Sequence, residues 1–279
     1  MNLSISEQLT YSTIRIECED VNGNLSTGTG YFFKFKENKE TGEHITALIT
    51  NKHVINNAQN GKLIFTMSSK EGKPIDTDHY PVIVNDFEKS WIMHPDEDVD
   101  LCIFPIAGLL NDLRSKNINL FYIPIDLSFL PTKEQLEDLS ALEEVIMIGY
   151  PNGIWDAYNN KPILRKGVTA TQPILDYNGK KEFMIDMACF PGSSGSPVFI
   201  FNEGGYQDKK GKTFMGESRI IFLGTLYAGP QYVAIGEIDI VNISTETKPI
   251  SISQIPINLG LVIKHDRILE LEELLTNYI

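Results

Sequence analysis

Short apolar runs separated by turn residues extend along most of the chain. The runs are rich in Val, Ile, Leu and aromatic residues, and 21 Gly and 14 Pro punctuate the sequence. Runs of this length between turn signals are typical of strands in a barrel or sandwich. A parallel α/β sheet is disfavoured, because its crossovers need long helical segments. The pattern predicts an all-β fold, with strands at residues 13–18, 28–35, 45–51, 62–67, 80–85, 101–106, 144–149, 163–170, 182–188, 197–201 and 220–227.

Two segments have a helical pattern instead. In residues 132–144, Thr132 is suited to an N-cap, and leucines recur at 136, 139 and 142. Residues 265–278 place leucines and isoleucines on one face and predict a C-terminal helix. The polar residues 202–212 and the segment 228–251 are expected to be long surface loops or hairpins.

The net charge excludes some classes of partner. The 279 residues include 37 acidic and 24 basic side chains, for a formal charge of -13. A nucleic-acid binder needs a basic face against the phosphates, and an anionic membrane surface also attracts basic segments. We therefore expect neither nucleic acid nor a membrane as a partner.

Cysteine usage and the amino terminus bear on the compartment. The first residues lack the basic and apolar regions of a signal peptide, and no apolar run reaches the roughly 20 residues of a transmembrane helix. The three cysteines, Cys18, Cys102 and Cys189, lie far apart and form no CxxC pair. These features predict a reducing, cytoplasmic location.

Three aspartates alternate in the segment HPDEDVDL. Asp96, Asp98 and Asp100 resemble the opening of an EF-hand calcium loop. That loop needs Gly at its sixth position and Glu at its twelfth, where this sequence has Leu101 and Ala107. We therefore expect no metal site here. The histidines at 44, 79, 94 and 265 are expected to be surface or structural residues.

Two further segments complete a set of residue types suited to acyl transfer. His53 follows the apolar run of ALITNKHVI, and Gly192 and Gly195 flank Ser193 and Ser194 in CFPGSSGSPVF. Glycines allow backbone N–H groups to converge on one point, which stabilises an oxyanion beside a nucleophile. A serine nucleophile needs a base, and the base needs an acid that fixes its tautomer. The sequence offers these roles in the order His, Asp, Ser.

These segments resemble trypsin-like serine proteases, especially the HtrA/Deg branch. ITNKHVI resembles the catalytic-histidine segment, DLCIF the segment with the catalytic aspartate, and PGSSGSPVF the nucleophile motif. Weaker similarities are found in STGTGYFF, VIMIGYPNG and NLGLVIK, so the resemblance extends from about residue 26 to residue 264.

The resemblance implies a fold and a set of roles. His53 would be the general base and acid, Asp100 the orienting carboxylate with Asp98 as the weaker candidate, and Ser194 the nucleophile. The backbone N–H groups of Gly192 and Ser194 would form the oxyanion hole. The fold would be two antiparallel six-stranded β-barrels, with residues 1–125 carrying His and Asp, and residues 126–279 carrying Ser and the terminal helix. The connection would lie within residues 109–142, and no cofactor is implied.

The resemblance also locates a substrate pocket. Ala188, six residues before the nucleophile, would lie at its base and offers no carboxylate for Arg or Lys. Cys189 would line it as a small buried residue, with a redox-sensitive thiol as the alternative, and the segment with Tyr227 and Gly229 would form the opposite wall. A small or medium apolar side chain before the scissile bond is expected. The ending SGSPVF also resembles glutamyl endopeptidases, but no matched histidine is found.

Departures from the family pattern concern activation. Ser193 stands where trypsin has the aspartate that pairs with a newly freed amino terminus, so cleavage-driven activation is not expected. No PDZ-like module follows the last matched strand, and we expect a stand-alone peptidase domain. The leading hypothesis is a serine endopeptidase acting on a protein or peptide substrate. Two alternatives stay open: a protease activated by a protein partner, and a catalytically silent module that binds peptides.

Overall fold

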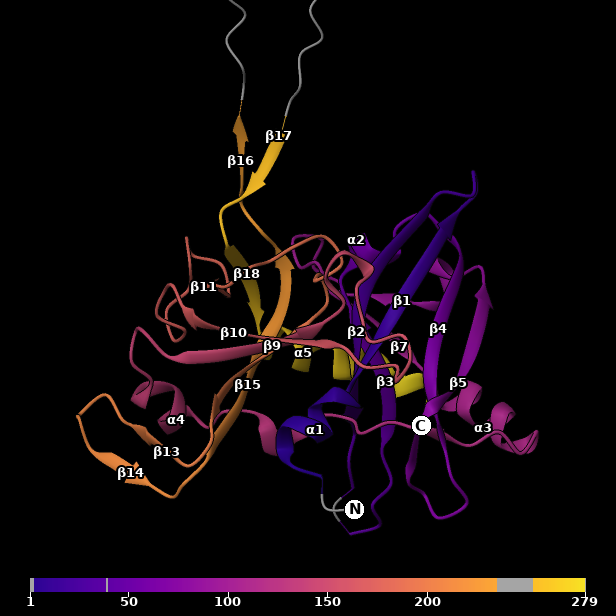
Figure 1. Ribbon diagram of the computed structural model, residues 1–279, viewed down its shortest axis with the longest axis horizontal. Coiled ribbons are helices and arrows are strands. Elements are labelled where there is room, and N and C mark those ends of the chain that lie inside the picture. The colour runs from indigo at the N-terminus through magenta and orange to yellow at the C-terminus, as the bar shows by residue number, and fades with distance from the viewer. Residues whose placement is uncertain (1–2, 39, 235–252, 279) are drawn as a thin grey trace, which may run out of the picture.

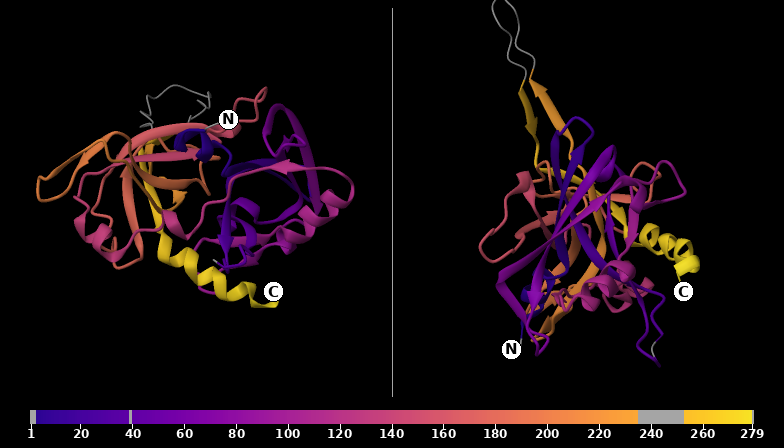
Figure 2. Two further views of the ribbon diagram at one scale, coloured as in Figure 1. Left: turned by 90° about the horizontal axis from the view of Figure 1, so that it is seen from below. Right: turned by 90° about the vertical axis from the view of Figure 1, so that its right-hand side faces the viewer.

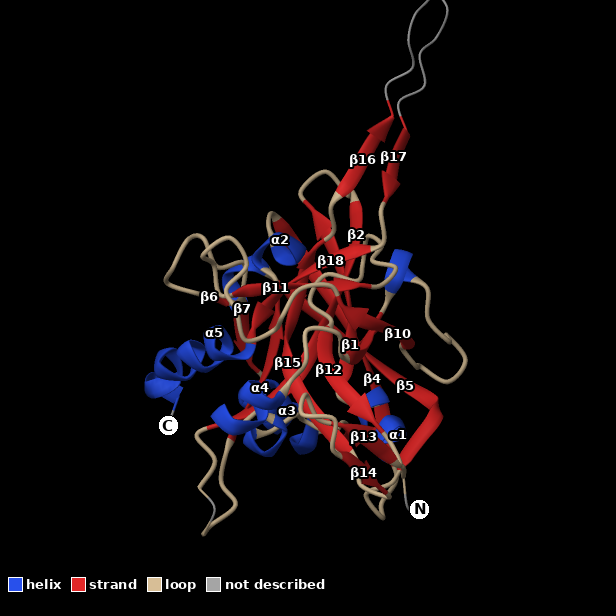
Figure 3. Cartoon of the chain, turned by 90° about the vertical axis from the view of Figure 1, so that its left-hand side faces the viewer, coloured by secondary structure: helices blue, strands red, loops and turns tan. Residues whose placement is uncertain are grey.

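The chain folds into two strand assemblies that pack against each other. The computed structural model describes residues 3–38, 40–234 and 253–278. In Figure 1 the N-terminal strands, in indigo and purple, lie beside the C-terminal barrel, in pink, orange and yellow. Figure 3 shows helices only at the periphery of this β structure, and Figure 2 shows the terminal helix crossing beneath both assemblies. The chain was expected to be all-β, and the structure confirms that it is mostly β.

The N-terminal assembly is an eight-stranded antiparallel sheet. Its order is β5-β4-β1-β2-β3-β7-β6, and β8 pairs with β4 beside this path. The strands are β1 (Thr13–Asp20), β2 (Leu25–Phe35), β3 (Ile45–Thr50), β4 (Ala58–Ser68), β5 (Pro74–Asn85), β6 (Ile92–Met93), β7 (Cys102–Pro105) and β8 (Leu120–Phe121).

The C-terminal assembly is a closed barrel of six strands, in the order β10-β11-β18-β15-β12-β9. Two short ribbons, β13-β14 and β16-β17, stand outside it. The strands are β9 (Glu144–Gly149), β10 (Ile163–Thr169), β11 (Glu182–Asp186), β12 (Pro197–Asn202), β13 (Gly205–Gln207), β14 (Thr213–Met215), β15 (Arg219–Ala228), β16 (Gln231–Ala234), β17 (Ser253–Pro256) and β18 (Leu259–Lys264).

One barrel of the expected two is therefore confirmed. In the described residues the N-terminal sheet has β5 and β6 at the ends of its hydrogen-bonded order, so a second closed barrel is not confirmed. The chain passes from this sheet to the barrel between Phe121 and Glu144. The division of the chain at residue 125 stays a prediction.

Alternation along the strands explains how the two assemblies share a core. In β9, Val145 and Met147 face the barrel interior, whereas Ile146 and Ile148 pack in a second cluster between the assemblies. Successive side chains of a strand point to opposite faces, so a strand with both faces covered is apolar throughout. The shared cluster also contains Phe33 of the N-terminal sheet.

Helices cover the ends and edges. They are α1 (Ile5–Thr10), α2 (Lys52–Ile55), α3 (Ala107–Ser115), α4 (Lys133–Asp138) and α5 (His265–Leu269), with 3₁₀ turns η1 (Glu88–Ser90), η2 (Leu127–Phe129), η3 (Pro151–Gly153) and η4 (Glu270–Tyr278). The C-terminal helix begins at the expected residue and continues as η4. Among the described residues, no helix is long and apolar enough to cross a membrane.

The helix expected at residues 132–144 is shorter than the pattern suggests. Thr132 caps α4 in a capping box with Gln135, as its residue type predicts. The helix ends at Asp138, because Leu139 turns to an extended backbone and is buried in the barrel core. The polar segment 202–212 includes part of the β13-β14 ribbon, and most of segment 228–251 lies outside the described residues.

Candidate active site

His53 lies on a single helical turn that follows β3 directly. Asn51, extended at the N-cap, ends the strand, and its carbonyl accepts from the Val54 N–H at 3.2 Å. The Asn51 side-chain Nδ2 donates to the Asp100 carbonyl at 2.7 Å. This bond ties the start of α2 to the segment before β7. The local sequence thus fixes the position of His53, whose side chain keeps 48% of its surface exposed.

The Asp100 carboxylate contacts His53 through both of its oxygens. Oδ2 lies 2.5 Å from His53 Nδ1, and Oδ1 accepts from the His53 backbone N–H at 3.0 Å. A carboxylate facing Nδ1 selects the tautomer whose proton is on that nitrogen, which leaves Nε2 as a free base. The pair has the geometry of a base and its orienting acid.

The other two aspartates do not reach His53. Asp96 Oδ1 accepts from the Asp98 N–H at 3.0 Å, and Asp96 forms an ion pair with Arg267 of α5. The part of the chain that the structure describes contains no group of three or more Asp, Glu, His or Cys side chains suited to a metal ion.

Ser194 lies in a tight turn between β11 and β12. Gly192 and Gly195 each have φ +86°, a backbone region that side chains disfavour. A Cβ at Gly195 would lie 1.9 Å from the Thr29 carbonyl oxygen, and one at Gly192 would lie 2.6 Å from that of Tyr150. The glycines therefore allow the turn to pack directly on neighbouring backbone.

The Ser194 hydroxyl is oriented toward the opposite wall of the pocket. Its Oγ donates to the Tyr227 carbonyl at 3.5 Å, a long hydrogen bond. No hydrogen bond joins Ser194 to His53 within the described residues. Catalytic hydrogen bonds are often long or poorly aligned before substrate binds, so this geometry agrees with a resting site.

The peptide between Pro191 and Gly192 is turned by a bond from a distant loop. The Asn152 N–H donates to the Pro191 carbonyl at 2.5 Å. In a planar trans peptide the C=O and N–H point in opposite directions, so the Gly192 N–H faces away from Asn152. Neither the Gly192 N–H nor the Ser194 N–H has an acceptor among the residues that the structure describes. Both donors are thus available for an anionic oxygen.

Thr29 of β2 supports this turn from beneath, and it is fully buried. Its hydroxyl accepts from the Tyr150 N–H at 3.1 Å and donates to the Gly192 carbonyl at 2.9 Å. Its backbone N–H donates to the Ser194 carbonyl at 2.9 Å. This role of Thr29 was not predicted, because the sequence indicates only a strand at STGTG. The available signal was a threonine between two glycines.

A cavity of about 130 Å³ opens beside Ser194. Its lining includes three of the expected pocket residues, Cys189, Tyr227 and Gly229, and most of its side chains are apolar. Ala188 is not among the lining residues. Its carbonyl instead accepts from Arg165 at 3.1 Å. Burial raises the pKa of the Cys189 thiol to about 11, so the pocket holds a neutral thiol.

The side chain of Tyr227, which lines this cavity, contacts the acidic residue Glu182. Its hydroxyl donates to Glu182 Oε2 at 2.9 Å. Burial, then the Glu182 carboxylate and the charge of Asp100, raise the Tyr227 pKa, so this hydroxyl stays protonated. Glu182 was not predicted as a site residue, since it lies outside the three motifs.

Comparisons with known proteins show what this chain is similar to. The family model described as the trypsin-like peptidase domain matches residues 28–205. No curated protein matches. Among solved structures, the HtrA-type protease AlgW with a tripeptide is 14% identical with a TM-score of 0.49, over 96% of this chain and 61% of that one. The thermostable serine protease AL20 from an extremophilic microorganism is 10% identical with a TM-score of 0.44, over 92% of each chain.

The solved structures and the family model match different shares of the chains compared. This chain spans less than two thirds of the AlgW chain, whereas the family model covers more than half of this chain. That coverage includes the segments of His53, Asp100 and Ser194. The chain belongs to the trypsin-like peptidase domain family.

Proposed function

We propose that this protein is a serine endopeptidase that hydrolyses peptide bonds through an acyl-enzyme. The observation that carries the proposal is the pair of contacts between Asp100 and His53, beside a glycine-flanked Ser194. Membership of a peptidase family supports the reaction class. The roles are nucleophile for Ser194, general base and acid for His53, and orienting carboxylate for Asp100.

Acylation begins when substrate enters beside Ser194. Oγ attacks the scissile carbonyl carbon, and His53 Nε2 accepts the hydroxyl proton. The N–H groups of Gly192 and Ser194 donate to the oxygen, which becomes an anion in the tetrahedral intermediate. His53 then gives its proton to the leaving amine, the C–N bond breaks, and the acyl group stays on Ser194.

Deacylation repeats these steps with water. His53 takes a proton from water, which attacks the ester carbon, and the oxyanion is again stabilised by the two N–H groups. Collapse returns the proton from His53 to Ser194 Oγ and releases the carboxylic acid product. Asp100 stays ionised throughout, because its role is to stabilise the imidazolium and hold the ring.

The residues proposed for catalysis come from both assemblies. His53 and Asp100 come from the N-terminal sheet, whereas Ser194 and the oxyanion donors come from the barrel. This division supports the double-barrel interpretation, with residues 1–125 and 126–279 as its two halves. Cys18, Cys102 and Cys189 are all buried and unpaired, which favours a reducing compartment such as the cytoplasm.

The pocket favours a small or medium apolar residue before the scissile bond. Among the described residues, no carboxylate lines the cavity beside Ser194, and the cavity volume of about 130 Å³ suits a short side chain. A hydrophobic pocket discriminates between side chains of different size by about 1–3 kcal/mol per methylene. We therefore expect a preference for small aliphatic residues over Arg, Lys, Asp or Glu.

The test is digestion of a peptide library, with products sequenced by mass spectrometry. Wild-type protein should cleave after small apolar residues, and Ser194→Ala should cleave nothing. Cleavage that survives Ser194→Ala would contradict the serine mechanism. A folded wild type that binds peptides without cleaving them would favour the silent binding module instead.

A further inference from the structure

One loop of the barrel is fixed to the N-terminal sheet at one end and, at the other, to the turn of residues 189–196, here called the oxyanion turn. We propose that Asn160 and Lys161 are positioning residues for the Gly192 N–H, acting through the loop of residues 150–161, here called the docking loop. The inference rests on the proposed function, because it assigns a role in that reaction. Neither residue touches the substrate pocket.

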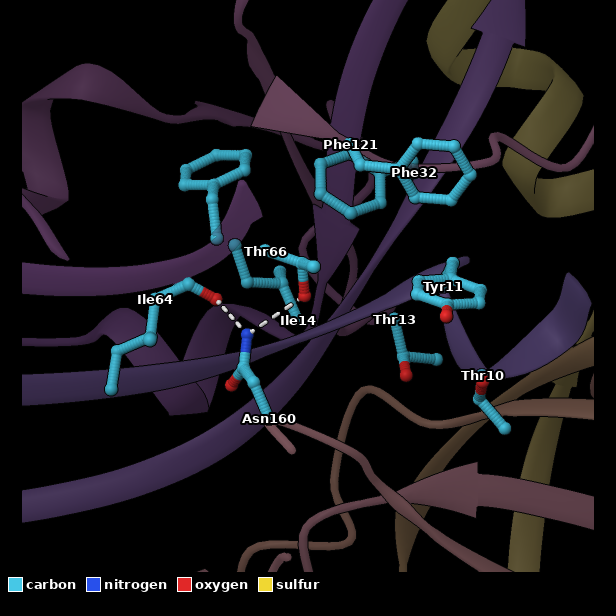
Figure 4. Close-up of a pocket in the computed structure, with 10 residues that line it drawn as sticks. Thr10, Tyr11, Thr13, Ile14, Phe32, Ile64, Thr66, Phe121 and Asn160 are labelled. Atoms are coloured by element: carbon cyan, nitrogen blue, oxygen red, sulfur yellow. Dashed lines mark hydrogen bonds between the residues drawn. The ribbon is translucent and has the colours of Figure 1, made fainter. Parts of the chain in front are cut away.

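Asn160 holds the far end of the docking loop. Figure 4 shows its side chain inserted among residues of the N-terminal sheet, where Nδ2 donates to the Ile64 carbonyl at 3.1 Å and to Thr66 Oγ1 at 3.3 Å. Asn160 is only 7% exposed and lies with φ +51°. A buried amide donor with two acceptors fixes the loop in one place, because displacing it would leave polar groups unpaired.

Lys161 adds a second anchor beside the first. Its Nζ lies 2.8 Å from Asp76 Oδ1 and 3.2 Å from the centre of the Tyr11 ring. The Tyr11 hydroxyl donates to the same Asp76 oxygen at 2.7 Å. A cation held by a carboxylate and an aromatic face is more restrained than an exposed ion pair.

Hydrogen bonds within the docking loop close a turn at its far end. Asp156 and Lys161 exchange two backbone hydrogen bonds, at 3.0 and 3.1 Å. The Asp156 carboxylate accepts from the backbone N–H groups of Tyr158 and Asn159, each at 3.1 Å. Trp155 lies 3.9 Å from the Arg15 guanidinium, which adds a contact with β1. Residues 155–161 therefore form a closed turn attached to the sheet.

The near end of the loop reaches the oxyanion turn. Asn152 has φ +51°, and its N–H donates to the Pro191 carbonyl. This bond orients the Pro191–Gly192 peptide, so that the Gly192 N–H points away from Asn152. If the far anchors were lost, the loop would be less restrained and the orientation of the Pro191–Gly192 peptide would be less fixed.

The consequence is that the N-terminal sheet contributes to the oxyanion hole as well as to the base. Substitutions at positions 160 and 161 should then slow the chemical step far more than they weaken substrate binding. Removing one oxyanion donor costs about 10²- to 10³-fold in kcat, and a donor that is only misplaced should cost less, about tenfold or more.

The experiment compares Asn160→Gly and Asn160→Asp with the matched control Tyr158→Ala. Glycine tolerates the positive φ of residue 160, so any effect of Asn160→Gly comes from loss of the side chain and not from backbone strain. Asn160→Asp keeps the shape of the side chain but puts a carboxylate oxygen, which cannot donate when ionised, in place of the amide Nδ2 donor. Tyr158 lies in the same loop and is 74% exposed. The readouts are the rate of labelling by a fluorophosphonate, kcat and KM with a p-nitrophenyl ester, and hydrogen exchange of residues 189–196.

We expect both Asn160 variants to lose about tenfold or more in kcat and in labelling rate, with KM within about twofold of wild type. Exchange of residues 189–196 should become faster in both variants, and Tyr158→Ala should match wild type. Unchanged exchange at residues 189–196 would overturn the inference, whatever the activity. A wild type that is inert to the fluorophosphonate would instead contradict the proposed function, while exchange would still test the coupling.

Discussion

Thr29 and Gly192 lie 163 residues apart in the chain and are joined by a 2.9 Å hydrogen bond between the threonine hydroxyl and the glycine carbonyl. The same hydroxyl accepts from the Tyr150 N–H, where the docking loop begins. One buried side chain thus connects β2, the end of β9 and the turn that carries Ser194. The oxyanion turn depends on contacts from both assemblies.

Replacing Thr29 with valine should impair catalysis and stability together. Valine keeps the shape but leaves the Tyr150 N–H and the Gly192 carbonyl without their partner, at a cost of about 1–3 kcal/mol for each buried group. We expect kcat to fall about tenfold to a hundredfold, as the Gly192 N–H loses its support. Thr29→Ser keeps the hydroxyl and is the matched control, since it should retain most activity. Equal kcat values for the two variants would argue against the role of the hydroxyl.

Asp100→Asn should reduce kcat by about 10⁴-fold, because an amide at this position favours the wrong tautomer of His53. Steady-state kinetics with an ester substrate measure the effect, and the melting temperature confirms folding. Asp98→Asn removes a carboxylate two residues away that does not contact His53, and it should leave kcat within about twofold of wild type. The reverse result would assign the orienting role to Asp98.

Stability should depend on the C-terminal helix. Leu271 of η4 is fully buried in the cluster shared by the two assemblies. Leu271→Ala should lower the free energy of unfolding by about 2–5 kcal/mol, through lost burial and the cavity it leaves. Glu273→Ala, at an exposed position of the same turn, should change it by less than about 0.5 kcal/mol. Urea titration of both variants gives the comparison.

Acid should destabilise the fold through His94. Burial lowers the pKa of His94 below its ordinary value of 6.5, and the positive charges of Arg267 and Lys52 add to this, whereas Glu270 and Asp96 oppose it. His94 Nδ1 accepts from the Asp96 N–H at 3.1 Å, and Nε2 lies 3.2 Å from Glu270 Oε2. The unfolded chain therefore binds the proton more readily than the folded one, so stability is lost as pH falls below about 6.5 and through the folded pKa.

Unfolding by urea at about pH 7 and about pH 5.5 tests this sign. His94→Gln should show a smaller loss of stability between the two pH values than wild type. His44→Gln alters an exposed histidine and should follow wild type. A residual loss in His94→Gln is expected from His265, whose pKa burial also lowers. A wild type that is more stable at the lower pH would contradict the account.

The sequence alone predicts the strands well, because burial on both faces leaves an apolar run that needs no tertiary information. The segment of β9 is one example, where the expected and observed bounds coincide. The residues proposed for the triad could also be named from the sequence, since their short motifs are local, and their assignment as a triad stays a prediction. Their roles came from the family resemblance, and the geometry of Asp100 and His53 came only from the structure.

Features set by distant contacts were not predictable. The helix at residues 132–144 ends early because Leu139 is buried in the barrel core, and leucines at every third position give no sign of that. The helix α3 was missed, as its start at Ala107 has no side-chain cap. The anchoring of Asn160 depends on acceptors about a hundred residues earlier, which no local pattern encodes.

The most direct test of the central claim is labelling with a fluorophosphonate, followed by mass spectrometry of the modified peptide. The reagent reacts with a serine only when a base and oxyanion donors activate it. We expect one adduct per molecule, located on Ser194 in wild type and absent from Ser194→Ala and His53→Ala. An adduct on another residue, or no adduct on folded wild-type protein, would contradict it.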